Sequence, residues 1–161
     1  IDNQVFSEKY LVTIKALLIK RKYLIKYGNG NGVIESSGEN EWEIAHKQDL
    51  KILDPLNAQI QMRINVKKMV DLNDFSPFEI ALQDIRDGDI EINTYKFSRN
   101  DKYVFDDETY DSIVIERVRE QDSRVTEYYL VPKLGFLIVE VIDKKETSTE
   151  RLKLQKILSL G

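Results

Sequence analysis

The stretch VTEYYLVPKLGFLIVEVIDKKETSTERLKLQKIL, residues 125–158, decides the predicted fold. Val, Ile, Leu, Tyr and Phe are concentrated in three segments of it, residues 125–131, 136–142 and 151–158, and such segments between turns indicate strands. The VPKLG of residues 131–135 predicts a tight corner, and the DKKETS of residues 143–148 predicts a polar hairpin loop. The stretch therefore predicts an antiparallel meander, and the rest of the chain must add strands to it or cover its apolar face.

Four further strand segments precede the meander, at residues 78–83, 89–97, 102–105 and 110–118. Asp87-Gly88 predicts a hairpin turn between the first two. The polar residues at 99–101 and 106–108 predict the next two loops. This part of the chain is therefore predicted to be β throughout.

Two of these segments carry apolar side chains on both strand faces. In residues 89–97 the apolar positions change parity, from Ile90 and Ile92 to Tyr95 and Phe97. Residues 136–142 are apolar at odd and even positions alike. A flat strand with one buried face cannot satisfy either pattern, so we expect a bulge or a strong bend in each. Such strands predict a curved sheet.

Residues 10–19 fit two structures. Their alternating apolar side chains favour a strand, whereas Leu11, Ile14 and Leu18 with Ser7 as a cap fit a short helix. We favour the strand, because Tyr23, Ile25 and Tyr27 continue the alternation. Residues 1–9 are predicted to fray.

The GNGNG sequence at residues 28–32 is the strongest turn signal. A glycine-rich loop can hold phosphate when a helix follows it, but residues 33–37 have strand composition, so we favour a hairpin turn. A strand at Trp42–Ala45 is expected next.

Asp54-Pro55 predicts the start of a helix. Asp54 can cap the first turn, and Pro55 suits the first helical position because its missing N–H would be unpaired there. Leu56, Ile60 and Ile64 recur every four residues and predict the apolar stripe that lies on the sheet. The helix is predicted to end near residue 70.

Composition limits the class of protein. The chain has 161 residues, 42% hydrophobic and 32% charged, which predicts one folded domain over residues 1–161. Its apolar runs are too short for a transmembrane helix. Basic residues appear mixed with acidic ones at a net charge of −4, so no nucleic-acid partner is expected. There is no cysteine to form a disulfide or a thiolate metal site, and Ile1 in place of Met leads us to expect a trimmed amino terminus.

Several motifs resemble, in order, the bacterial domain-of-unknown-function family 3108. They are DPLNAQ at residues 54–59, YKF at 95–97, RVTEYYLVPKLGFLIV at 124–139 and LKLQKI at 152–157. The 126–139 hairpin is the most specific of them, although Tyr129, Val131 and Ile138 depart from the Trp, Ala and Pro usual in the family. The resemblance covers residues 53–158.

The resemblance implies an exported, periplasmic protein of the Gram-negative envelope. It also implies a fold similar to the periplasmic lipoprotein carriers: a mainly β, strongly curved antiparallel half-barrel with one or two helices covering its concave face. The family has no assigned reaction, and no ligand-binding residue can be transferred to this chain from the carriers.

Residues that could support chemistry have simpler interpretations. His46 is the only histidine and is predicted to be a surface residue. Asp84, Asp87 and Asp89 are spaced like part of a calcium loop but lack its later ligands, so a turn is favoured. The acidic residues at 106–108 could form a carboxylate pair for acid–base chemistry, but solvated loop residues are favoured. No candidate base lies close in the sequence to Ser36, Ser37 or Ser112. Trp42 and the eight tyrosines are predicted to be core residues more than pocket residues. No catalytic residue, metal ligand or cofactor is predicted.

Two functions follow as hypotheses. The first is a non-enzymatic periplasmic module that binds an apolar or lipid-like ligand on the concave sheet face, under a cover of Leu56, Ile60 and Ile64. The second is a structural or protein-interaction component of the envelope with a packed core and a protein partner. An enzyme is the third and weakest hypothesis.

Overall fold

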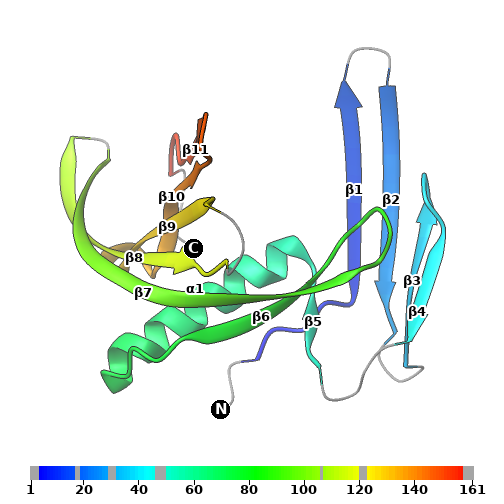
Figure 1. The fold of residues 1–161 in the computed structure, drawn as a ribbon, viewed down its shortest axis with the longest axis horizontal. Coiled ribbons are helices and arrows are strands. Elements are labelled where there is room, and N and C mark those ends of the chain that lie inside the picture. The colour runs from blue at the N-terminus through cyan, green and yellow to red at the C-terminus, as the bar shows by residue number, and fades with distance from the viewer. Residues whose placement is uncertain are drawn as a thin grey trace. The chain divides into compact units, whose positions relative to one another are not determined.

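The computed structural model describes residues 4–16, 19–28, 32–45, 50–105, 107–119 and 123–157. Within them the fold is mainly β, with one α-helix, a four-stranded sheet of order β1-β2-β3-β4 and a seven-stranded sheet of order β11-β10-β9-β8-β7-β6-β5 (Figure 1). The chain divides into two compact units, residues 1–58 with 80–92, and residues 59–79 with 93–161. Whether the chain is one domain, as its length predicts, stays a prediction.

The first unit contains the four-stranded antiparallel sheet, formed by β1 (Lys9–Ala16), β2 (Ile19–Tyr27), β3 (Val33–Gly38) and β4 (Trp42–Ala45). The favoured strand is thus confirmed over residues 10–16, whereas Ile19 begins β2, which returns antiparallel to β1, a reversal that was not predicted. The hairpin predicted at GNGNG is also confirmed, because β2 and β3 pair antiparallel and the Gly28 N–H donates to the Val33 carbonyl at 3.0 Å. Asn29, Gly30 and Asn31 lie outside the described residues.

The core of the first unit contains residues from both sheets. Its buried members are Ile25, Tyr27, Ile34, Ile52 and Ala81. Ile52 belongs to β5 (Ile52–Leu53), which pairs parallel with β6 (Phe78–Gln83). β5 was not predicted from the sequence, because two residues are too few to show a strand period. The Asp87-Gly88 turn is confirmed: the Gly88 N–H donates to the Asp84 carbonyl at 3.1 Å, and Gly88 has φ +84°.

The helix α1 (Pro55–Leu72) begins where predicted and extends two residues past 70. Asp54 caps it, since its Oδ1 accepts the N–H of Leu56 at 2.9 Å and of Asn57 at 3.0 Å. The predicted apolar stripe, however, is wrong in phase. Leu56 is 60% and Ile60 44% exposed. The stripe that the helix buries consists of Ala58, Met62, Val66 and Met69.

The second unit contains β7 (Ile90–Phe105) from residue 93 onward, β8 (Glu108–Arg117), β9 (Val125–Val131), β10 (Leu137–Lys144) and β11 (Thr149–Lys153), all antiparallel. The predicted meander is therefore confirmed, except that its last strand, predicted over residues 151–158, spans Thr149–Lys153. The short helix η1 (Pro132–Leu134) and Gly135, at φ +66°, make the predicted corner. The loop predicted at residues 99–101 is wrong, because these residues lie within β7 and pair with β8.

Bulges account for part of the mixed parity. The register of β9 and β10 shifts between Ile138 and Glu140, which confirms the irregularity predicted in residues 136–142. In β7 the register shift lies between Phe97 and Arg99, just after the predicted segment. The change of apolar parity within the segment needs no bulge, because the Ile92 side chain is 53% exposed to solvent.

The predicted mainly β class is confirmed, but the strongly curved half-barrel is not supported, since neither sheet is closed or strongly curled. The parallel β5–β6 pair also makes the larger sheet mixed rather than purely antiparallel. No helix among the described residues is long and apolar enough to cross a membrane.

Candidate interaction surface

The polar residues weighed in the sequence have local structural partners. The Ser36 hydroxyl donates to the Asn40 carbonyl at 3.0 Å, and the Ser112 hydroxyl to the Asp101 carbonyl at 3.1 Å. The carboxylates of Asp84 and Asp87 accept backbone N–H groups two residues ahead, at 2.7 and 3.1 Å, which confirms that they stabilise a turn. His46 and Asp106 lie outside the described residues.

The aromatic residues belong largely to the cores, as predicted. Five of the tyrosines are buried: Tyr23, Tyr27, Tyr95, Tyr103 and Tyr129. The indole N–H of Trp42 donates to the Ile85 carbonyl at 3.4 Å, and the ring packs against the first unit's core. In the second unit, Tyr103 and Tyr129 pack with aliphatic side chains that are each at most 9% exposed. These side chains fill a face of the sheet themselves.

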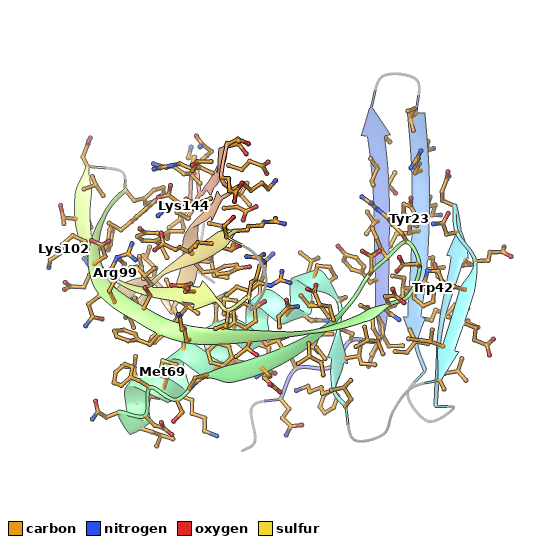
Figure 2. The ribbon with its side chains drawn as sticks, viewed as in Figure 1. Tyr23, Trp42, Met69, Arg99, Lys102 and Lys144 are labelled. Carbon is orange, nitrogen blue, oxygen red and sulfur yellow. The ribbon has the colours of Figure 1, made fainter. Side chains whose placement is uncertain are left out.

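Buried carboxylates in the second unit are held by cations. Glu127 accepts hydrogen bonds from Arg99 on β7 and from Lys144 on β10, the latter at 3.0 Å. Figure 2 labels these two cationic residues. Burial opposes ionisation of Glu127, but the two cations outweigh it and lower its pKa. These groups are engaged with one another, so the cluster stabilises the sheet. Among the described residues no group of acidic or histidine side chains gathers as a metal site would require.

The far end of the β1–β2 hairpin has fewer partners than the clusters described above. β3 pairs with residues 23–27 of β2, and the Glu39 N–H just after β3 donates to the Lys22 carbonyl at 2.9 Å. Residues 19–21 of β2 pair along the strand with β1. Figure 1 shows the hairpin extending beyond β3 and β4. We call residues 11–15 and 19–22 the distal ribbon. Tyr23, the last residue of β2 that pairs with β3, is 3% exposed, and Ile19, near the far end, is 54% exposed.

One face of the hairpin is cationic. Side chains of directly paired residues share a face, and the pairs Lys9–Lys26, Thr13–Lys22 and Lys15–Lys20 therefore place five lysines together. The Lys26 ammonium donates to Glu35 Oε1 at 2.8 Å. Within the described part of the chain, no acidic side chain forms an ion pair with Lys15, Lys20 or Lys22.

The opposite face is apolar. It carries Val12 opposite Tyr23 and, beyond that pair, Ile14 and Ile19. Arg21 lies on the same face, with its Nε 3.7 Å from Glu39 Oε1. Ile14 is 42% exposed and Ile19 54%, and Leu11 on the lysine face is 54% exposed. The distal ribbon thus presents unpaired positive charge on one face and uncovered apolar side chains at its far end.

This surface was not predicted, although the sequence carries its signal. The description of the basic residues as mixed with acidic ones is wrong locally: Lys9–Tyr27 contains six basic residues and no acidic one. The lysines at 20, 22 and 26 are separated by even numbers of residues, which puts them on one face of a strand.

Comparisons of the chain with protein-family models, with curated proteins and with solved structures find no match. The resemblance to family 3108 therefore stays a prediction that rests on the motifs alone.

Proposed function

We propose that this chain is a non-enzymatic binding protein of the cell envelope, and that its binding surface is the distal ribbon rather than an interior cavity. The observation that carries the proposal is the exposure of both ribbon faces: Leu11 is 54% exposed on the lysine face, and Ile14 and Ile19 are 42% and 54% exposed on the other. Exposed apolar side chains beside unpaired cations are a feature of contact surfaces. The periplasmic location is supported only by the family resemblance.

The hypothesis of an apolar ligand held on a sheet face has less support. Two side chains of its predicted cover, Leu56 and Ile60, are exposed to solvent. One apolar face of the second unit's sheet is occupied by its own side chains, among them Tyr103, Tyr129 and Val139. A packed core with an external interaction surface agrees better with this burial.

Site-specific photocrosslinking in cells tests the proposal. A benzoylphenylalanine replaces Thr13, which is exposed between the lysines of the ribbon, and in a control replaces Val104, which is 68% exposed on a strand of the second unit. We expect a reproducible crosslink to a protein or a lipid from position 13 and none from position 104. Equal labelling from both positions, or none from position 13, would overturn the proposal.

A further inference from the structure

We propose that the partner of the distal ribbon is an anionic phospholipid surface. This inference rests on the proposed function, because it names what the same ribbon binds. It predicts peripheral binding, with the lysines at the phosphate groups and the apolar end of the ribbon at the headgroup boundary.

The charges favour an anionic partner. Lys15 and Lys20 lie directly opposite each other, and Lys22 is the next residue along the same face. Like charges in directly opposed positions repel, so an anionic surface against this face would relieve the repulsion. The cations on the face are all lysines, whose ammonium groups act as mobile point charges and do not need the fixed geometry of an arginine fork. Such groups suit a fluid array of phosphates.

The apolar side chains favour a lipid surface over other anions. Ile14 and Ile19 lie near the far end of the ribbon, and Leu11 is exposed on the lysine face. A bilayer interface accepts apolar side chains and phosphate-bound lysines at once. A nucleic-acid backbone would meet the charges but leave these three side chains in water.

A second copy of the chain fits the ribbon less well. β1 is an edge strand of its sheet and could pair with another β1. That pairing would join two sheets whose ribbons each carry lysines on one face, and it would leave the lysines without counter-charge. An acidic protein is the remaining alternative, and the experiment below separates it from lipid.

Vesicle flotation tests the inference on the whole chain. The probes are vesicles of phosphatidylcholine alone and of phosphatidylcholine with about 30% phosphatidylglycerol, an anionic lipid. We expect the protein to float with the anionic vesicles only, and to be released at about 1 M salt, where charges are screened beyond about 3 Å.

Two variants localise the binding, each with a matched control. Because each lysine near an anionic surface contributes about fivefold to binding, Lys15→Gln/Lys20→Gln/Lys22→Gln should weaken binding by about 100-fold. Its control, Lys68→Gln/Lys102→Gln/Lys156→Gln, removes the same charge from exposed positions elsewhere and should bind like the wild type. Ile14→Thr/Ile19→Thr should also weaken binding, whereas Ile92→Thr/Val104→Thr should not. All four change exposed side chains, and melting curves check their folding.

The outcomes separate the inference from the proposed function. Absence of flotation on anionic vesicles, or equal loss in ribbon and control variants, overturns the lipid inference. If position 13 then still crosslinks to a protein in cells, the ribbon remains the binding surface and its partner is an acidic protein. If neither assay detects binding by the ribbon, the inference and the proposed function both fail.

Discussion

Asp54 ties the amino-terminal segment to the start of α1. It is 2% exposed and accepts hydrogen bonds from the Ser7 hydroxyl at 2.6 Å and from the Asn57 side-chain amide at 2.7 Å, besides the two N–H groups that it caps. The Ser7 hydroxyl in turn accepts the Asp54 N–H at 2.8 Å. Ser7, considered in the sequence as a helix cap for residues 10–19, serves this network instead.

We predict that Asp54→Ala lowers the free energy of unfolding by about 2–3 kcal/mol, because it removes a helix cap and leaves buried donors unpaired. Urea unfolding followed by the fluorescence of Trp42, which lies in the same unit, measures the loss. The control is Asp71→Ala, which removes only an exposed pair with Lys67 and should cost about 0.5 kcal/mol or less. Equal losses in the two variants would show that the Asp54 network contributes little.

Both the Trp42 ring and the backbone conformation require glycine at position 88. A Cβ at this position would lie 2.8 Å from Cε3 of the Trp42 ring, and φ is +84°. Gly88→Ala should therefore destabilise the first unit by about 2 kcal/mol or more and shift the tryptophan emission. Gly32→Ala, at φ +66° with nothing within 4 Å of the added Cβ, isolates the backbone cost and should lose about 1 kcal/mol. An unchanged emission in Gly88→Ala would contradict the contact.

Asp143 links stability to acid pH. Arg124 donates to it from Nε at 2.8 Å and from Nη2 at 2.6 Å, and Thr126 donates at 2.9 Å. The Arg124 hydrogen bonds lower the pKa of Asp143 from 3.8 to about 2. A carboxyl with a depressed folded-state pKa stabilises the fold above its unfolded pKa and loses that contribution as the pH falls through the folded one.

We therefore predict that Asp143→Asn is less stable than the wild type by about 1–2 kcal/mol at pH 6, and that the difference shrinks between pH 4 and pH 2. Circular dichroism during urea unfolding at several pH values gives the two curves. A gap that stays constant down to pH 2 would mean that the ion pair does not carry the effect.

At the scale of elements, the phase of α1 decides which side chains stabilise it. Met62 is 3% exposed and Ile60 44%. We predict that Met62→Ala costs about 2–4 kcal/mol of unfolding free energy, whereas Ile60→Ala costs about 1 kcal/mol or less, since alanine is also the better helix former. Urea unfolding of both variants measures these losses. A larger loss of unfolding free energy in Ile60→Ala than in Met62→Ala would contradict the burial of the Met62 face and favour the stripe predicted from the sequence.

The same helix shows what its sequence could and could not predict. Asp54 and Pro55 mark its start because capping is local chemistry. The buried stripe was missed because apolar residues occur at 60 and 64 as well as at 62, 66 and 69, so tertiary contacts and not periodicity choose the face. In β7, Arg99 looked like a loop residue because it is polar, but its partner Glu127 lies 28 positions away. Sequence patterns do not carry such distant pairings.

At the scale of the whole molecule, charge is distributed unevenly. The chain has a net charge of −4, yet Lys9–Tyr27 holds six of its 24 basic residues without an acid among them. Averaging over the composition concealed the cationic face, which becomes apparent only when β1 and β2 are paired in register. The candidate surface could thus have been found from period-two charge patterning once the hairpin was assumed.

The most direct test of the ribbon as the binding surface is native mass spectrometry of protein purified without detergent, with organic extraction of any bound molecule. The wild type and Lys15→Gln/Lys20→Gln/Lys22→Gln are measured side by side. We predict that the variant has the mass of the polypeptide alone. Any lipid adduct found on the wild type should be absent from the variant. A reproducible lipid mass that persists in the variant would contradict the account and place the ligand in the interior.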